Sequence, residues 1–424
     1  MRLGYLLSTA VFTLVVGVGT AAYADPVEIN FFERYTSPSQ RDYDKWLIDS
    51  FNQAFAGKIH VTLGGTEDDA FKAKINSVLR SPDAPDVFFS WEGGWAKYMI
   101  DSGYAAPLDA YYQKYGWDKT LNPAGVALAT FDGKKYFVPQ MISASILWYR
   151  PDILQAHGIT PPKNWTDFVG AKDKLKGDGI ALTMLANQQQ WPAQFLWTSI
   201  LVNKYGVDLY NQLLTRKVAW TDPRVVDAFA MMKKMMDDGD FEPGANGLDV
   251  TPAVVPFGQG KVATWFQGSF MLTTFLDASG KPKFPLDFVP LPQIGDQQPT
   301  MSVFVENTLM INTNSKHQDE AAEFLNYVLS KESQTKYALQ ARMLFPANIE
   351  VDLSSLDPMV QRLGKAISTY KQSTFMHVDH ALAPAVSDPY LQALQGVLVG
   401  STTPEDAAKL TEQAAQGEQG PVSP

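Results

Sequence analysis

Side chains that can bind or polarise a small molecule gather at three places in the first hundred residues. Residues 33–36, 66–69 and 91–95 combine carboxylates, a guanidinium group, hydroxyls and indole rings. Charged and hydroxyl groups exchange hydrogen bonds with a polar ligand, whereas aromatic rings cover its apolar faces. The three groups therefore predict one mixed polar and aromatic binding surface, provided that the fold brings them together.

The strands and helices expected around these groups predict that the fold brings the three groups together. Short apolar strands are expected at 27–32, 59–63 and 86–89, and amphipathic helices at 40–55 and 71–79. Strands and helices that alternate at this spacing are typical of βαβ units in a parallel sheet. Ligands of such sheets bind beyond the carboxyl ends of the strands, where the three groups lie.

Three later segments match catalytic or metal-binding motifs only in part. Residues 258–261 (GQGK) lack the four-residue gap and the hydroxyl residue of a phosphate-binding loop. Residues 267–270 (QGSF) do not form the G-x-S-x-G turn of a serine hydrolase. Residues 377–380 (HVDH) place two histidines and an aspartate together without the further ligands of a metal site. We therefore predict no catalytic residue, no metal and no cofactor.

Carboxylates and tryptophans leave a carbohydrate enzyme open as an alternative. A glycoside hydrolase needs two carboxyl groups at a defined separation, which the sequence does not give. Glu33, Glu67, Glu92 and Glu306 are the candidates near predicted strand ends. The chain has 10 Trp, and indole rings suit the C–H face of a sugar. A secreted carbohydrate-active hydrolase is therefore the main enzyme alternative.

Composition restricts the class of protein. The chain has 424 residues, a formal net charge of −10 and no Cys. This length exceeds that of most single cores and predicts two domains or lobes. Without Cys, neither disulfides nor thiolate metal sites stabilise the chain. Because no Lys/Arg-rich stretch supplies a basic surface, we predict that it does not bind nucleic acid.

The N-terminus resembles an export signal. Arg2 precedes an apolar run from about Leu6 to Val18, and the small-residue pattern Ala22-Tyr23-Ala24 follows. This pattern predicts a signal peptide at 1–24 that is cleaved after Ala24, and hence a secreted or periplasmic protein. The apolar run is short for a membrane span, although an uncleaved anchor is the alternative.

The rest of the chain predicts a second α/β region. Strands are expected at 135–139, 146–149 and 284–291, and helices at 165–176, 192–204, 224–238, 319–341 and from 403.

Several segments, taken in order, resemble one known family. They are residues 85–89 (PDVFF), 103–109 (GYAAPLD), 133–139 (GKKYFVP), 147–152 (LWYRPD), 161–168 (PPKNWTDF), 257–263 (FGQGKVA), 268–270 (GSF) and 320–325 (EAAEFL). The family is that of the extracellular solute-binding proteins of ABC sugar importers, the maltose-binding-protein-like group.

The resemblance implies an α/β, two-lobed periplasmic-binding-protein fold with a hinge and a ligand cleft between the lobes. It places the N-lobe at 25–137 plus 304–345 and the C-lobe at 138–303 plus 346–424. The expected function is capture of a mono- or oligosaccharide, or a glycoside, by a monomer that then meets the membrane permease subunits of the importer. A receptor for a non-sugar solute remains an alternative, because one fold serves many ligands.

The resemblance also implies ligand contacts. Tyr149 matches a cleft-lining tyrosine of the family, and Ser143 stands where some members have a carboxylate. Phe270 replaces the usual tryptophan, for which Trp191 or Trp265 could compensate. With the residues at strand ends and crossovers, the predicted ligand-binding set is Glu33, Arg34, Tyr35, Thr66, Glu67, Trp91, Glu92, Ser143, Tyr149, Trp191, Trp265, Gln267, Gly268, Ser269, Phe270, Glu306, Asn307 and Arg342.

Overall fold

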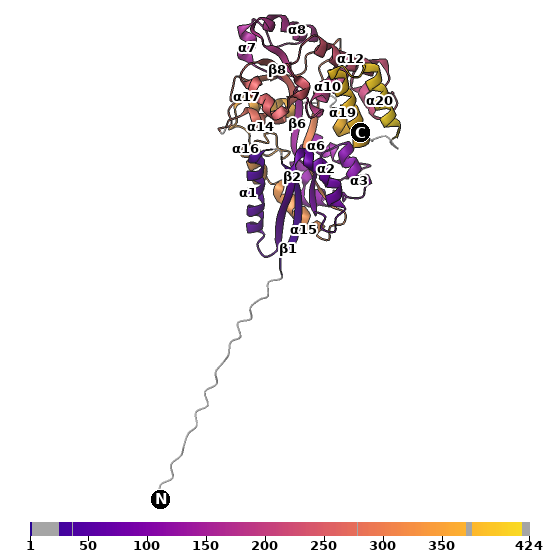
Figure 1. The fold of residues 1–424 in the computed structure, drawn as a ribbon. Helices are drawn as coiled ribbons and strands as arrows, with labels where there is room; N and C mark the ends of the chain where they lie inside the picture. The colour runs from indigo at the N-terminus through magenta and orange to yellow at the C-terminus, as the bar shows by residue number, and fades with distance from the viewer. Residues whose placement is uncertain (2–24, 36, 278, 370–374, 418–424) are drawn as a thin grey trace.

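A computed structural model describes Met1 and residues 25–35, 37–277, 279–369 and 375–417 (Figure 1). Apart from Met1, the predicted signal peptide lies outside the described residues, and so does the predicted cleavage after Ala24. Across the described part of the chain, no helix is both long and apolar enough to span a bilayer.

The N-terminal part forms the predicted parallel sheet. Strand β1 pairs in parallel with β2 on one side and with β3 on the other. The elements are β1 (Val27–Tyr35), α1 (Pro38–Ala54), β2 (Ile59–Glu67), α2 (Asp68–Leu79), β3 (Val87–Ser90) and α3 (Gly94–Asp101). Helix α1 begins where expected because the Ser37 side chain caps the amide of Gln40 and Pro38 occupies the first turn. The predicted βαβ units are thus confirmed.

A late strand completes this half of the sheet. Strand β10 (Val303–Ile311) lies between β3 and β6 (Val138–Tyr149) and is antiparallel to both. The prediction of two separate strands at 135–139 and 146–149 was wrong, because β6 is one strand that is buried along its whole length. Its polar residues Ser143 and Ser145 do not interrupt it, since their hydroxyls bond to Ser269 and His377.

Strand β6 continues into the other half of the molecule. There it pairs with β8 (Val262–Gly268) and β9 (Asp287–Val289), and β7 (Ala181–Met184) is parallel to β8. The strand order is β2-β1-β3-β10-β6-β8-β7, with β9 beside β6. Figure 1 shows two lobes, with β1, β2 and α1 in the lower one, β8, α8 and α12 in the upper one, and β6 between them.

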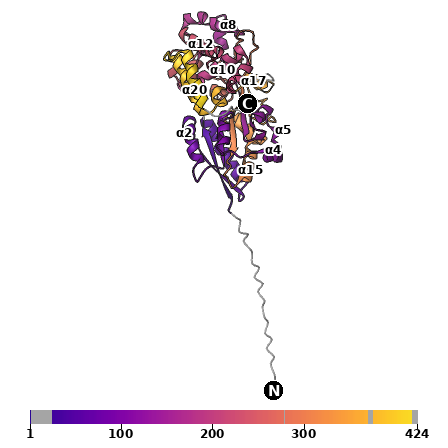
Figure 2. The same ribbon diagram turned by 90° about the vertical axis from the view of Figure 1, so that its right-hand side faces the viewer.

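Helices cover both lobes, as the view turned by 90° also shows (Figure 2). The lower lobe has a short hairpin of β4 (Thr130–Phe131) and β5 (Lys134–Lys135). The remaining helices are α4 (Asp109–Tyr115), α5 (Trp117–Thr120), α6 (Pro123–Leu128), α7 (Pro151–Ala156), α8 (Trp165–Gly170), α9 (Lys172–Leu175), α10 (Trp191–Tyr205), α11 (Val207–Leu214), α12 (Pro223–Asp237), α13 (Val250–Gly258), α14 (Leu272–Phe275), α15 (Gln318–Val328), α16 (Lys331–Leu339), α17 (Pro358–Thr369), α18 (Val378–Ala381), α19 (Pro384–Val399) and α20 (Pro404–Gly417), with 3₁₀ turns at η1 (Lys176–Asp178), η2 (Ala245–Gly247) and η3 (Ser269–Met271).

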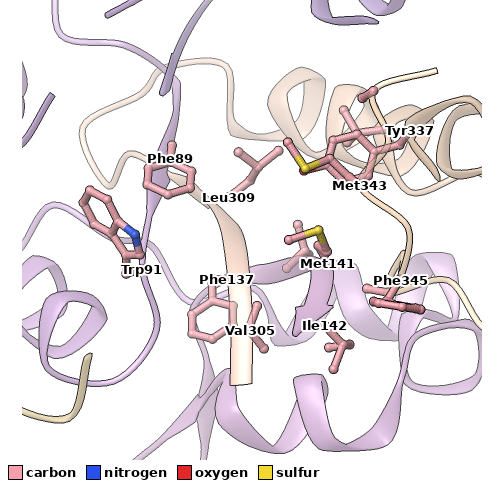
Figure 3. Close-up of a cluster of buried hydrophobic side chains, with 14 of the residues drawn as sticks. Phe89, Trp91, Phe137, Met141, Ile142, Val305, Leu309, Tyr337, Met343 and Phe345 are labelled. Atoms are coloured by element: carbon pink, nitrogen blue, oxygen red, sulfur yellow. The ribbon is translucent and has the colours of Figure 1, made fainter. Parts of the chain in front are cut away.

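Three chain segments meet between the lobes. In β6, Ile142 lies opposite Val305 of β10, and its amide donates to the carbonyl of Phe345 at 2.8 Å. Figure 3 shows the buried side chains at this meeting point, among them Met141, Ile142, Val305 and Phe345. Segments far apart in the sequence thus run side by side where the chain passes from one lobe to the other.

Candidate functional site

A cavity of about 610 Å³ opens beyond the carboxyl ends of β1, β2 and β3. Its lining includes Arg34 and Tyr35 at the end of β1, Glu67 at the end of β2 and Trp91 after β3. The register places Tyr35 opposite Glu67, which explains why these strand ends share one rim. Further lining comes from α1 and α2 of the lower lobe, from β10 and from upper-lobe elements, so the cavity lies between the lobes.

The lower wall centres on the guanidinium group of Arg34, which is 5% exposed. Its Nη2 donates to Asn307 Oδ1 at 2.7 Å and lies 3.4 Å from Glu306 Oε1. The guanidinium carbon also lies 5.3 Å from the centre of the Trp91 ring. Asn307 is oriented in turn, since its Nδ2 donates to the hydroxyl of Tyr337. The cation is therefore held in one orientation before any ligand arrives.

The upper wall is aromatic. Trp191 at the start of α10 and Phe270 in η3 are partly exposed, and their ring centres are 6.1 Å apart. Phe195, one turn further along α10, lies 5.6 Å from Trp191 and 6.1 Å from Phe270. Gly268 makes room for this wall, because a Cβ there would lie 2.1 Å from the Phe270 ring. The three rings offer an apolar surface opposite the polar lower wall.

Two further charged pairs border the cavity. Arg41 and Glu67 lie 3.4 Å apart at the exposed rim. Deeper inside, His380 of α18 lines the cavity, and its Nδ1 lies 3.0 Å from Oε1 of the fully buried Glu92. Burial acts to lower the pKa of His380, but the carboxylates of Glu92, Asp379 and Glu306 together raise it to about 9. His380 is therefore an imidazolium at neutral pH.

The comparison with family models decides the family. A model described as bacterial extracellular solute-binding protein matches residues 37–335, which is more than half of the chain. The chain belongs to this family of bacterial extracellular solute-binding proteins.

Relatives and solved structures agree with this assignment. An uncharacterised ABC transporter extracellular-binding protein of Pyrococcus horikoshii is 20% identical over 391 residues, 90% of this chain and 85% of that protein. The melibiose/raffinose/stachyose-binding protein MelE of Bacillus subtilis is 22% identical over 325 residues, 74% of this chain and 73% of that one. Among solved structures, a chitin oligosaccharide binding protein has a TM-score of 0.82 at 20% identity, over 93% of this chain and 99% of that one. The maltose/maltodextrin-binding domain of Bdellovibrio bacteriovorus, bound to maltotriose, has a TM-score of 0.71 at 20% identity, over 92% and 99%. The structural likenesses establish the two-lobed α/β fold of periplasmic binding proteins.

The structure brings part of the predicted ligand-binding set of this solute-binding protein to the cavity. The predicted residues that line it are Arg34, Tyr35, Glu67, Trp91, Trp191, Phe270, Glu306 and Asn307. They come from strand ends, from the start of α10, from η3 and from the bulged part of β10.

Some predicted residues lie next to the cavity without lining it. Glu33, beside Arg34, is 2% exposed and accepts from the amide of Arg34 at 2.8 Å. Thr66 likewise precedes Glu67 without lining the cavity, and Glu92 lies behind His380. Burial raises the pKa of Glu33 to about 8, against the opposing effect of Arg34.

Other predicted residues belong to the packing of the upper lobe. Trp265 is completely buried between Phe257 and Phe275, so it is a core residue and not a platform for a ligand. Tyr149 is buried outside the cavity lining and stands opposite Asp287 of β9. The family match at this position therefore does not put its ring in the cavity.

The turn after β8 supports the aromatic wall without lining the cavity. Ser269 bonds to Ser143 at 2.8 Å, and both hydroxyls are buried. Gln267 is also buried, and its side chain accepts from the amide of Gly268. Arg342 has a positive φ of 61° and donates to the carbonyl of Leu276, so it too stays outside the lining.

Several lining residues were missed by the sequence analysis. They are Ser37, Pro38, Arg41, Ala70, Lys72, Met141, Gln189, Phe195, Val250, Thr251, Met271, Thr273, Thr274, Met343, Asp379 and His380. Asp379 and His380 had been noticed only as part of a possible metal motif. The structure gives this motif another arrangement, in which His377 bonds to Ser145 and stacks on Phe195 while His380 pairs with Glu92. Within the described ranges, no three potential metal ligands come together.

Proposed function

We propose that this solute-binding protein captures a neutral mono- or oligosaccharide, or a glycoside, in the cavity between its lobes. The observation that carries the proposal is the contrast between the two walls. Arg34, Glu306 and Asn307 present fixed hydrogen-bonding groups, while Trp191, Phe195 and Phe270 present apolar rings. A sugar has both kinds of surface, hydroxyls at its edge and C–H groups on its face, and aromatic rings cover the latter at small entropic cost.

Charge balance favours a neutral ligand. The lining cations are Arg34, Arg41, Lys72 and His380, and the lining carboxylates are Glu67, Glu306 and Asp379. Glu92 adds a further negative charge directly behind His380. Since the charges at the cavity cancel, an anionic or cationic solute would meet no excess of the opposite sign. A non-sugar charged solute is therefore the less favoured ligand class.

Size is compatible with a small saccharide. The cavity volume of about 610 Å³ falls within the roughly 300–1,000 Å³ of small-molecule sites. A ligand without matching hydroxyls would displace water from the polar lower wall without replacing its hydrogen bonds, and such a ligand would be rejected.

The family and several relatives support a transport role. The Bacillus subtilis relative is named as a binding protein for melibiose, raffinose and stachyose, and the Pyrococcus relative as an ABC transporter extracellular-binding protein. We propose that this protein acts as a monomer in the periplasm after cleavage behind Ala24, and that it delivers its sugar to the permease subunits of an ABC importer. It binds the sugar without turning it over.

Lobe boundaries are part of the proposal. We place the three points at which the chain crosses between the lobes where β6, β10 and the 345–346 segment run side by side. The predicted lobe boundaries are 137/138 in the first crossing and 303/304 in β10. Phe304 stands opposite Ser143, so the β10 crossing lies beside the middle of β6 and not beside its start. We therefore move the first boundary to about residues 142–143 and keep the other two.

A thermal-shift screen of the protein lacking residues 1–24 tests the function. The probes are neutral mono-, di- and oligosaccharides, uronic acids and amino acids. A ligand at a hundredfold excess over Kd stabilises the folded state by about 2.7 kcal/mol, a shift that such a screen detects. We expect a shift with one class of neutral saccharide that is recovered unchanged afterwards. A shift with charged solutes alone would overturn the proposal in favour of a receptor for a non-sugar solute. Loss of the sugar during incubation would overturn it in favour of a carbohydrate-active hydrolase.

A further inference from the structure

Glu92 and His380 come from different lobes. Glu92 follows β3 and precedes α3 in the lower lobe. His380 lies in α18, which is attached to the upper lobe on both sides. His377 Nε2 lies 2.6 Å from Ser145 Oγ in β6, and the amide of Asp379 donates to Gln194 of α10 at 2.9 Å. The 3.0 Å contact between Glu92 and His380 therefore connects the two lobes.

The backbones on either side of this pair also touch. A Cβ on Gly94 would lie 2.3 Å from the carbonyl carbon of Leu382, and one on Gly93 would lie 2.1 Å from the carbonyl oxygen of His380. Only glycine allows this approach, because any larger residue would separate the start of α3 from the 380–382 segment. The contact is thus built for close apposition of the lobes, beside the β10 crossing, where the His380 ring lies 5.6 Å from the ring of Phe304.

We propose that the Glu92–His380 ion pair is a latch that joins the lobes across the ligand cavity and favours their closed arrangement. Its role in ligand capture rests on the proposed function, but its effect on lobe closure does not depend on a ligand. Both side chains are at most 10% exposed, so the pair is shielded from water where the lobes meet. Breaking such a buried pair by removal of one partner is costly, because it leaves a charge without a counter-ion.

The charge on His380 makes the latch depend on pH. The groups that face it are Glu92 from the loop after β3, Glu306 from β10, and Asp379 and His377 from its own segment. Burial, and then His380 itself, keep the pKa of His377 well below its usual value, so that ring stays neutral. Opening the lobes takes Glu92 away from His380 and lowers the pKa of His380 relative to about 9 in the closed form. Closure therefore binds a proton, and its contribution is lost as pH rises through about 9.

The test measures lobe closure directly, without any ligand. The sequence contains no Cys, so Lys45→Cys in α1 and Lys234→Cys in α12 give two specific labelling sites, one in each lobe. Both native side chains are about three-quarters exposed. Single-molecule energy transfer between two dyes then reports the ratio of closed to open molecules between pH 7 and pH 10.

We expect the labelled protein to move toward the open distribution as pH rises, by about tenfold in the closed-to-open ratio for each unit by which closure raises the pKa of His380. His380→Gln and Glu92→Gln should be more open at pH 7 and lose the pH dependence. Gly94→Ala keeps both charges but blocks the backbone contact, so it should also open the lobes. His60→Gln is the matched control, because His60 pairs with Glu28 at 2.7 Å on the surface of one lobe.

A closed-to-open ratio that is constant with pH and equal in His380→Gln overturns the latch. If His380→Gln fails to fold, the pH titration of the parent and the Glu92→Gln and Gly94→Ala variants decide the question. Absence of any saccharide shift in the thermal screen, together with a pH-dependent closure, would overturn the proposed function and leave the latch standing.

Discussion

At the scale of single residues, orientation separates ligand contacts from core packing. Arg34 reaches the cavity because Asn307 and Glu306 hold its guanidinium group, while its neighbour Glu33 points into the lower lobe. Trp191 and Trp265 differ in the same way. The first is partly exposed in the cavity wall, and the second is completely buried.

This difference predicts opposite effects of truncation. Trp191→Ala should weaken binding of the saccharide found in the screen by about tenfold, since an aromatic contact contributes about 1.4 kcal/mol, and should leave the ligand-free melting temperature nearly unchanged. Trp265→Ala should instead lower stability by about 3–5 kcal/mol through the cavity it leaves. Calorimetric titration and urea unfolding measure the two quantities. Equal losses of stability in both variants would assign Trp191 to the core.

The buried carboxyl of Glu33 predicts a pH effect on stability. Its pKa of about 8 in the folded protein means that it keeps a proton which the unfolded chain releases near 4.5. Folding stability therefore falls as pH rises from about 5 to 8, by at most about 1.4 kcal/mol per unit from this group. Glu33→Gln should gain stability over the parent across that interval and match it near pH 5.

Urea unfolding at pH 5, 6.5 and 8 measures this difference. Glu350→Gln, at an exposed position, is the control and should follow the parent throughout. If Glu33→Gln is less stable than the parent at pH 8, Glu33 is ionised in the folded state and stabilises Arg34 as a counter-ion.

At the scale of elements, short turns after strands place the functional side chains. The turn after β8 brings Phe270 to the cavity through Gly268, whose φ of −63° is ordinary for any residue. Only the close approach of the Phe270 ring requires glycine at this position.

Gly268→Ala should therefore push the Phe270 ring out of place without straining the backbone. We expect saccharide affinity to fall by about 1 kcal/mol, the contribution of one aromatic contact, with little change in ligand-free stability. Gly170→Ala is a suitable control, because no atom lies within 4 Å of a Cβ there. Affinity equal to that of the parent would show that Phe270 does not touch the ligand.

Elements were easier to predict from the sequence than side-chain directions. The strands and helices up to residue 90 appeared where periodicity placed them, because each carries one apolar face. Trp265 was misplaced because an apolar strand with both faces buried gives no sign of which face meets the ligand. His380 was missed because its partner Glu92 is 288 residues away in the sequence. Neither the direction of the Trp265 side chain nor the pairing of His380 with Glu92 can be recognised from the neighbouring sequence.

At the scale of the whole molecule, two lobes share one sheet through β6. Their relative movement about the three side-by-side segments would open and close the cavity, which is the hinge type of domain motion. The latch lies beside this hinge, because the His380 ring that pairs with Glu92 also packs against Phe304 at the β10 crossing.

Closure on a ligand should make the molecule more compact. We expect small-angle X-ray scattering to show a smaller radius of gyration when the saccharide from the screen is added, and a mass that stays that of a monomer. Glu92→Gln should bind the same saccharide more weakly and need a higher concentration for the same compaction. A radius that does not change on saturation would mean that the lobes are already closed without ligand.

The position of β10 in the sheet has a consequence for the order in which the protein can fold. This strand lies between β3 and β6, yet residues 303–311 are synthesised long after both neighbours. At a synthesis rate of about 5–20 residues per second, β10 is made about ten seconds or more after β3. During that time the lower lobe lacks the strand that joins β3 to β6, so its sheet cannot be completed until residue 311 has been synthesised.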